Sequence, residues 1–311
     1  MAVPGAQTPE TTAAEPGRAA AALPEPTGAI LPEASSLALL GRQLLRSWPA
    51  TLSLLVLLLV VGAAVFAPWL TDRDPNQGDL RARLQPPSEA YLLGTDEQGR
   101  DMLTRVIYGG RIALQVGVFA TLIGLAVGVA MGLLSGYYRG WTDTVIMRVT
   151  DIVLSFPYIL LVIAIVSILG PSIYNAMIAI GVRIVPEFAR LVRSVVLSLR
   201  TREYVLAARA IGCSNTRIIV RHILPNCTAP IIVLATLNLA GAILAEASLS
   251  FLGLGAQPPA PSWGSMVARG GQYLVTHPHL SIVPGLAIMI VVYALNIFGD
   301  WLRDVLDPQT T

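Results

Sequence analysis

Long stretches without a charged residue constrain this chain more than any other feature of its sequence. Residues 47–71, 112–138, 152–182, 223–245 and 280–299 contain no Asp, Glu, Lys or Arg. A helix rises about 1.5 Å per residue and the hydrocarbon core of a bilayer is about 30 Å thick, so about 20 apolar residues cross it. Since lipid offers no partner for unpaired backbone groups, such runs are expected to be helices rather than barrel strands. The sequence therefore predicts an all-α membrane protein.

Six transmembrane helices are expected from these runs. The stretch 152–182 is too long for one straight span, and Gly170-Pro171 is typical of a turn between two helices. The expected spans are residues 48–70, 112–136, 142–169, 171–190, 223–245 and 280–299. In the second span, glycines at 117, 124, 128, 132 and 136 indicate a face that another helix approaches closely.

The chain before these spans has a different composition. Residues 1–36 contain six prolines, three glycines and few large apolar side chains, too few to build a core. We interpret them as a disordered cytoplasmic tail rather than a signal peptide, because no basic segment precedes an apolar run there. Residues 37–311 are expected to form the membrane domain.

The composition excludes several classes of function. With 54% hydrophobic and 13% charged residues, the chain is not typical of a water-soluble globule. All 21 basic residues are Arg, so the chain has no Walker A phosphate loop and no lysine nucleophile. A net charge of +2 without a basic patch is not typical of a nucleic-acid-binding protein. Cys213 and Cys227 lack the spacing of a zinc site and are expected to stay reduced in the cytoplasm.

The distribution of arginine predicts the orientation. With six spans, both tails and the loops after the second and fourth spans share one side and carry 13 Arg, against seven on the other side. Because Arg concentrates on the cytoplasmic side, both termini are expected to be cytoplasmic. The loop 72–111 opposes this orientation with six Arg, whereas the loop after the fourth span favours it with seven.

That loop after the fourth span has the pattern of a helical hairpin. A helix over residues 203–211 places four side chains on one face: Tyr204, Ala207, Ala208 and Ile211. Gly212 is suited to end this helix in a left-handed conformation. Ser214 or Asn215 then caps a second short helix that runs towards Pro225. Such a hairpin either docks into a cleft of a soluble partner or is a solvated loop at the membrane surface.

Several segments carry a family resemblance. The run EYVLAARAIGCSNTRIIVRHILPN at 203–226 resembles the "EAA" coupling segment of bacterial ABC-importer permeases, in particular the dipeptide/oligopeptide/nickel branch. Other segments are similar to signatures of that branch in the same order: LGTDEQGRDMLTRVIYGGRIAL at 93–114, SGYYRGWTDTVIMRVTD at 135–151, EASLSFLGLGAQPPAPSWG at 246–264 and GDWLRDVLDP at 299–308. The departures are Leu206 at the first motif position, where the family has Glu, and His222 in place of Ile.

The resemblance implies a permease subunit that imports peptides or similar small solutes and has a cytoplasmic coupling hairpin between helices four and five. Family members sit in the bacterial inner membrane, pair with a second permease, contact two cytoplasmic ATP-binding subunits and receive substrate from an external binding protein. ATP and Mg²⁺ belong to those partners, so neither a cofactor, a metal site nor catalytic activity is expected in this chain. The expected coupling residues are Tyr204, Ala207, Ala208, Arg209, Gly212, Ser214, Arg217, Arg221, His222, Leu224 and Pro225.

Four polar residues in or near the last two spans are candidates for the translocation path. Glu246 and Ser248 follow the expected fifth span, and a carboxylate at membrane depth faces protein or water rather than lipid. Asn238 and Asn296 lie inside spans. Each of these residues either lines the cavity or a gate, or forms a hydrogen bond between helices.

Polar segments between the spans have simpler interpretations. Residues 253–264, rich in proline, form a landing surface for a binding protein or a plain connector. Asp96, Arg100, Asp101 and Arg105 have the spacing of ion pairs on the solvated face of an amphipathic helix. The segment 277–279, His-Pro-His, predicts a turn rather than a nickel site, because no third ligand is near.

Two other classes of function compete with the permease. An intramembrane serine hydrolase would use Ser135 with a histidine such as His277, but the Gly-x-Ser-x-Gly pattern is absent and the two residues are expected at opposite membrane faces. A secondary transporter or channel would favour broken helices in paired repeats or a chain of buried carboxylates. The sequence has neither pattern.

Overall fold

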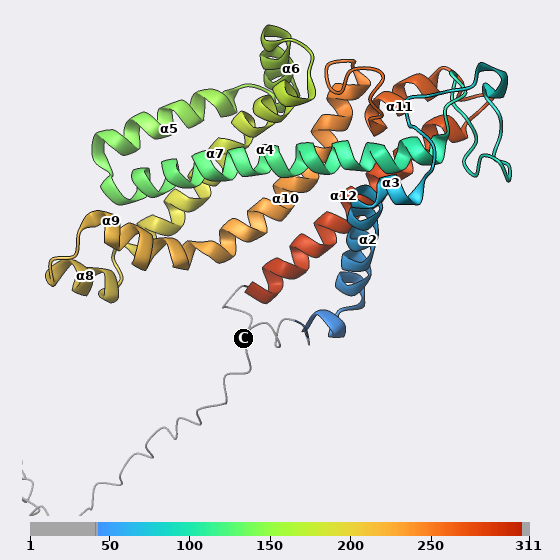
Figure 1. The fold of residues 1–311 in the computed structure, drawn as a ribbon. Coiled ribbons are helices and arrows are strands. Elements are labelled where there is room, and N and C mark those ends of the chain that lie inside the picture. Colours follow the sequence, from blue (N-terminus) through green and yellow to red (C-terminus); the bar gives the residue numbers. More distant parts are fainter. Residues whose placement is uncertain (1–40, 42, 307–311) are drawn as a thin grey trace, which may run out of the picture. The chain divides into compact units, whose positions relative to one another are not determined.

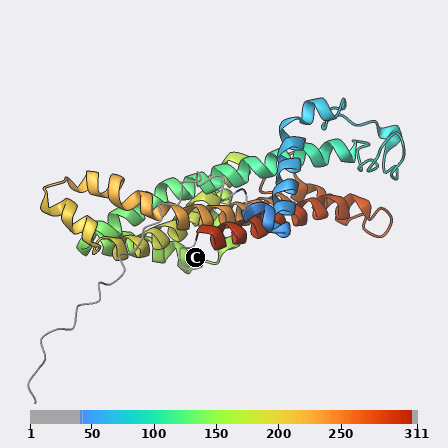
Figure 2. The ribbon, with the colours of Figure 1, turned by 90° about the horizontal axis from the view of Figure 1, so that it is seen from below.

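The structure is a computed structural model that describes residue 41 and residues 43–306, so the expected tail 1–36 lies outside the described residues. The regular elements of the described part are all helical (Figures 1 and 2). From residue 48 onward they are α2 (Trp48–Val65), α3 (Ala67–Leu70), a short 3-10 turn (Leu80–Ala82), α4 (Met102–Tyr138), α5 (Gly140–Ser155), α6 (Tyr158–Leu169), α7 (Ile173–Leu199), α8 (Glu203–Ala210), α9 (Asn215–Ile218), a π turn (Ile219–Ile223), α10 (Leu224–Phe251), α11 (Trp263–Gly271) and α12 (His279–Leu306).

Helix α4 packs along α7 through its glycine face. A Cβ atom on Gly136 would lie 2.7 Å from Val196 Cβ. A Cβ atom on Gly124 would clash with the Ile184 side chain in the same way. Residue numbers rise together along both contact faces, so the two helices run parallel. The expected close approach at the glycines is confirmed, because a larger residue there would push α7 away.

Helices α10, α11 and α12 pack against α4 and against one another. A Cβ on Gly117 of α4 would lie 2.9 Å from Ile243 Cγ1 of α10. The Trp263 indole at the start of α11 lies against Gly109 and donates from Nε1 to the Val106 carbonyl at 2.8 Å. Burying a large aromatic ring and satisfying its N–H together fix α11 on the end of α4.

The helical membrane architecture is confirmed, with fewer clear spans than expected. Helix α2, helix α4, the continuous helix Asn215–Phe251 and α12 are long and apolar enough to cross a membrane, and the bent pair of α5 and α6 raises this number to five. Helix α7 has 27 residues but carries Arg183, Glu187 and Arg190.

The segment expected to span the membrane at 142–169 is bent rather than one straight helix. Helix α5 ends at Ser155, α6 begins at Tyr158, and the two meet at an angle of 94°. Phe156 is extended, with φ −84° and ψ 137°. It precedes Pro157, and a proline ring disfavours helical backbone at the residue before it.

The ends of the helices also differ from the ends of the uncharged runs. Helix α4 begins at Met102 rather than near residue 112, because the Asp101 carboxylate accepts a hydrogen bond from the Thr104 amide at 2.8 Å and caps it. The other corrected limits are Val65 for α2, Leu199 for α7, Phe251 for α10 and Leu306 for α12. A run without charge marks the membrane-buried part of a helix, whereas caps and prolines decide its ends.

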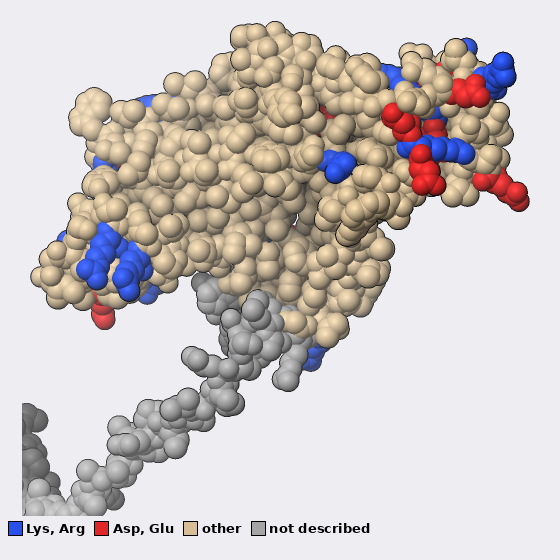
Figure 3. Space-filling view, viewed as in Figure 1, with Lys and Arg blue, Asp and Glu red and all other residues tan. Residues whose placement is uncertain are grey.

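Charged side chains gather at the two ends of the molecule. On the face drawn in Figure 3, arginines cluster near α8 at one end, and both signs of charge cluster around the loops that precede α4 at the other. The surface between them is almost uncharged. This band is consistent with a protein whose middle is embedded in lipid.

Candidate functional site

Residues 203–218 form a helical hairpin, and its tight turn is built as the sequence predicts. Helix α8 ends at Ala210, and Gly212 adopts φ +79°, a left-handed conformation that favours glycine. The Cys213 amide donates to the Ala208 carbonyl at 3.1 Å. Ser214 then caps α9 by accepting a hydrogen bond from the Arg217 amide. We call residues 203–218 the hairpin.

The hairpin buries one side against the protein and exposes the other. Val205 and Ala208, three residues apart, are buried. Ile211, at the tip, is 81% exposed, and Tyr204 and Leu206 are also exposed. The four side chains expected on one face therefore divide: Ala208 faces the protein body with Val205, whereas Tyr204, Ala207 and Ile211 face outwards. Exposed apolar side chains on a polar loop are typical of a surface that a partner covers.

The expected coupling residues surround this exposed side. Exposed are Tyr204, Ala207, Arg209, Gly212, Ser214, Arg217, Arg221 and Pro225; His222 and Leu224 are half-buried, and Ala208 is buried. These residues lie on one projecting segment, their coupling role stays a prediction, and Leu206 is exposed beside them.

Polar contacts attach the hairpin to the end of α4 near Tyr138. The Tyr137 hydroxyl donates to Asn215 Oδ1 at 2.7 Å, and the Arg209 guanidinium lies over the Tyr137 ring, 5.7 Å from its centroid. Nearby, Asp143 of α5 accepts two hydrogen bonds from Arg193 of α7, at 2.6 and 2.7 Å. The hairpin and the ends of three helices thus form one braced unit.

The second arm of the hairpin continues directly into α10. The sequence predicts a separate short helix before the fifth span, whereas α9, the π turn and α10 form one uninterrupted helix, Asn215–Phe251. The Leu224 amide donates to the Ile219 carbonyl, five residues back. Pro225 has no amide hydrogen to continue the normal pattern, which accounts for the wider turn there. The hairpin and α10 are therefore joined without a break in the helix.

A hollow of about 550 Å³, open to the surface of the chain, lies between α6, α7 and α10. Asn238 and Ser248 line it as candidates from the sequence, and each is hydrogen-bonded to its own helix, at Leu234 and Leu244 respectively. The remaining lining residues are Tyr158, Ile159, Glu187, Leu234, Leu237, Gly241, Leu244 and Ala245. Asn238 and Ser248 are the polar residues that α10 contributes to a wall that is otherwise apolar.

The structure places the other two path candidates elsewhere. Glu246 is 1% exposed and accepts hydrogen bonds from Ser250 at 2.6 Å and Ser262 at 2.9 Å, which tie the end of α10 to the loop before α11. Asn296 of α12 donates to the Val292 carbonyl of its own helix at 2.9 Å. Neither residue lines the hollow. Glu246 holds two segments together, as its packing interpretation predicts.

Sequence reasoning did not select Glu187, the charged residue that lines the hollow, or its partner Arg183. Arg183 Nη1 lies 3.1 Å from Glu187 Oε1, and the Arg183 guanidinium lies 5.1 Å from the centre of the Tyr158 ring. The sequence does contain a pattern that indicates this pair, because two opposite charges lie four residues apart inside an expected span.

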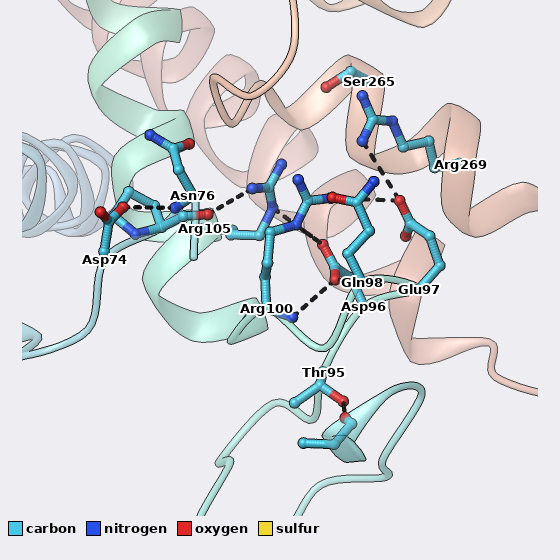
Figure 4. A network of polar contacts seen from close by, with 12 residues as sticks. Asp74, Asn76, Thr95, Asp96, Glu97, Gln98, Arg100, Arg105, Ser265 and Arg269 are labelled. Carbon is cyan, nitrogen blue, oxygen red and sulfur yellow. Dashed lines mark hydrogen bonds and ion pairs between the residues drawn. The ribbon is translucent and has the colours of Figure 1, made fainter. Parts of the chain in front are cut away.

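The opposite end of α4 carries a buried charged network (Figure 4). Arg100 Nε lies 2.6 Å and Arg105 Nε 3.4 Å from Asp96 Oδ2, while Arg269 of α11 lies 3.4 Å from Glu97. The prediction of a solvated amphipathic helix is wrong here, because residues 96–101 form a turn and Asp96, Arg100 and Arg105 are at most 5% exposed. We call Asp96, Glu97, Arg100, Arg105 and Arg269 the charged network.

Family models match two parts of the chain. Residues 128–311 match the binding-protein-dependent transport system inner membrane component, and residues 35–87 match the N-terminal transmembrane domain of oligopeptide transport permease C. The first match includes the hairpin, the hollow and the residues that surround them.

Relatives and a solved structure agree with these matches. The chain is 50% identical to the dipeptide transport system permease protein DppC of Alkalihalophilus pseudofirmus, over 86% of this chain and 88% of that protein. It is 43% identical to the glutathione transport system permease protein GsiD of Pectobacterium atrosepticum, over 86% and 89%. The fold is similar to a chain of the inward-facing MetNI methionine ABC transporter, with a TM-score of 0.55, 20% identity and coverage of 66% and 98%. The chain therefore belongs to the family of inner membrane components of binding-protein-dependent transport systems.

Proposed function

We propose that this protein is the permease subunit of an ATP-driven importer for peptides or peptide-like small solutes, and that its hairpin couples the membrane helices to ATP-binding subunits. The observation that carries this proposal is the hairpin itself: a rigid, projecting segment with exposed apolar side chains that continues into a membrane helix. The solute class rests on relatives whose names specify dipeptides, di- and tripeptides and glutathione.

The proposed assembly contains two permeases and two cytoplasmic ATP-binding subunits, with an external binding protein. The hollow supports a second permease, because it is open to the surface of a single chain and contains polar groups that lipid would not satisfy. ATP and Mg²⁺ are bound by the ATP-binding subunits, whose closure moves the docked hairpin as a rigid body. Movement of the hairpin rotates α10, whose polar side lines the hollow.

The proposed orientation places the hairpin and both termini in the cytoplasm. Helix α7 is taken as the sixth crossing, since 27 residues span about 40 Å and it runs parallel to the membrane helix α4. Six crossings put both chain ends on the side of the hairpin, which carries exposed arginines. The charged network then lies on the external side, where the binding protein approaches.

Site-directed cross-linking tests the docking of the hairpin. In a chain without native thiols (Cys213→Ser, Cys227→Ala), Ile211→Cys is expected to cross-link to an ATP-binding subunit in the assembled importer. Val275→Cys is the matched control, since Val275 is 98% exposed and lies after α11, at the other end. A cross-link from residue 275 but none from residue 211 would contradict both the coupling role and the orientation.

Uptake measurements test the solute class. Proteoliposomes that contain the complete importer, with ATP inside and the binding protein outside, are expected to accumulate radiolabelled dialanine. Liposomes with ADP in place of ATP are the control. ATP-dependent uptake of an unrelated solute, such as a sugar, with no uptake of any small peptide would contradict the proposed solute class.

A further inference from the structure

An ion pair lies at an unusual depth in this membrane protein. Arg183 and Glu187 are one turn apart on α7, with Arg183 Nη1 3.1 Å from Glu187 Oε1. Their side chains are 12% and 36% exposed, so the guanidinium is covered while the carboxylate remains open. Arg183 Nε is buried and has no hydrogen-bond partner in the described part of the chain.

The packing of α4 and α7 gives the depth of this pair. Ile184 lies beside Gly124 and Phe188 beside Gly128, and both glycines are near the centre of the uncharged run 112–138. The pair is therefore close to the middle of the bilayer. Charged side chains at that depth face a protein interior or a water-filled path, because exposure to lipid is costly.

The carboxylate opens into the hollow rather than into packed protein. Glu187 and Tyr158 line it together with Asn238 and Ser248, and its volume of about 550 Å³ is within the range of about 300–1,000 Å³ that small-molecule pockets have. Apart from Asn238 and Ser248, the wall of the hollow that α10 forms is apolar. A partly open carboxylate, a phenol and an amide around one cavity form a set of acceptors that suits a cationic amine.

We propose that Glu187 binds the amino group of the solute as it passes through the membrane, and that Arg183 and Tyr158 position its carboxylate. This inference rests on the proposed function and names the part of the solute that the path recognises. An ammonium group donates up to three hydrogen bonds, and one of them goes to the Glu187 carboxylate. Because Arg183 already neutralises much of the Glu187 charge, the site holds the amine weakly enough to release it.

The test compares transport with energy coupling in the complete importer. Glu187→Gln keeps the size of the side chain and removes its charge. Uptake of radiolabelled dialanine into proteoliposomes is expected to fall about tenfold, because a hydrogen bond to a charged group is lost at the pathway. ATPase activity stimulated by the loaded binding protein is expected to stay within about twofold of wild type, since the hairpin and its brace are unchanged. Glu187→Asp, which keeps the charge, is expected to retain more uptake than Glu187→Gln.

The matched control is a second ion pair that involves the same helix. Arg190 of α7 and Asp151 of α5 lie 2.7 Å apart, and both side chains are about half exposed outside the hollow. Asp151→Asn also removes one carboxylate from an Arg pair next to α7. Dialanine uptake by this variant is expected to equal that of wild type.

Accessibility provides a second measurement if Glu187→Gln does not assemble. In the chain with Cys213→Ser and Cys227→Ala, Glu187→Cys is expected to react with a water-soluble thiol reagent, and dialanine with its binding protein is expected to slow the reaction at least threefold. Equal uptake by wild type and Glu187→Gln, or no labelling of residue 187, would overturn this inference alone. If wild type itself carries no peptide, the proposed function fails and the inference with it.

Discussion

The two ends of α4 are stabilised in different ways. At the end near residue 102, a buried charged network and the Trp263 indole hold the loops and α11 to the helix. At the end near residue 138, the hairpin keeps apolar side chains such as Ile211 exposed and is attached through a few polar contacts around Tyr137. The first end is held together by buried charges and a buried ring, although side chains such as Val275 are exposed there too. The second end has fewer buried polar contacts to the helix and exposes the tip of the hairpin.

This difference predicts that substitutions at the two ends have opposite effects. Changes in the charged network are expected to lower stability and to leave energy coupling intact in the protein that still folds. Changes at the tip of the hairpin are expected to weaken coupling with little change in stability, because exposed side chains contribute little to folding.

The largest effect is expected for Arg105→Met. Arg105 is 2% exposed, lies 3.4 Å from Asp96 and donates to the Pro75 carbonyl at 2.6 Å. Its removal leaves Asp96 buried with one partner fewer, and breaking a buried ion pair costs about 3–5 kcal/mol. Denaturant unfolding in detergent measures this loss.

Arg83→Met is the control for this variant, since Arg83 is exposed and its one hydrogen bond, to Tyr273, is 3.5 Å long. Its free energy of unfolding is expected to change by at most about 0.5 kcal/mol. Equal losses in the two variants would show that the charged network does not stabilise this end.

Gly212→Val is expected to have the next largest effect, and mainly on coupling. A β-branched residue at φ +79° is strained, although no neighbouring atom lies within 4 Å of its Cβ position. The turn is expected to rearrange, at a cost of about 1–2 kcal/mol, and to misplace both arms of the hairpin. ATPase activity stimulated by the binding protein should then be abolished, while the chain still inserts in the membrane.

Gly212→Asn separates strain from the loss of glycine itself, because Asn tolerates the left-handed conformation. It is expected to keep most of the stimulated activity. Full activity of Gly212→Val would count against the coupling role of the hairpin.

The shape of the hairpin could be predicted from the sequence, because the residues at its turn determine it locally. Gly212 and Ser214 act on their own backbone, and their roles follow from residue type. The charged network was misread for the opposite reason. Arg100 and Arg105 have the spacing of exposed helical ion pairs, yet Arg269, far along the chain, helps to cover them, and no local pattern contains that information.

The surroundings of the four path candidates depend on how α10 and α12 pack. A polar residue in an apolar helix faces protein or water, and for Asn238 the sequence left open a cavity or a hydrogen bond between helices; Asn238 lines the hollow. Glu246 also faces protein, but away from the hollow, where its carboxylate accepts hydrogen bonds from Ser250 and Ser262. Choosing between these outcomes requires knowing which face α10 turns towards its neighbours, and its packing against α4 at positions such as Gly117 helps to set that face.

A smaller effect is expected for Ile211→Ser at the tip of the hairpin. Ile211 is 81% exposed, so its replacement is expected to change the free energy of unfolding by at most about 0.5 kcal/mol. If a partner buries it, about 1.5–3 kcal/mol of binding energy is lost, which weakens the affinity for the ATP-binding subunit at least about tenfold. Val275→Ser, at the opposite end, is expected to leave this affinity unchanged. Equal affinities for Ile211→Ser and wild type would show that the tip of the hairpin is not part of the interface.

The smallest effect is expected for Ser135→Ala, which tests how firmly the hairpin end is braced. The Ser135 hydroxyl donates to Asp143 Oδ1, and Arg193 holds both oxygens of the same carboxylate. Since Arg193 keeps Asp143 in place, loss of the hydroxyl is expected to cost about 1 kcal/mol of stability and less than about twofold in dialanine uptake. The same variant separates the permease from a serine hydrolase, which would lose all activity without its nucleophile. Retained uptake would identify Ser135 as part of the brace, whereas complete loss of function with normal assembly would require a chemical role for its hydroxyl.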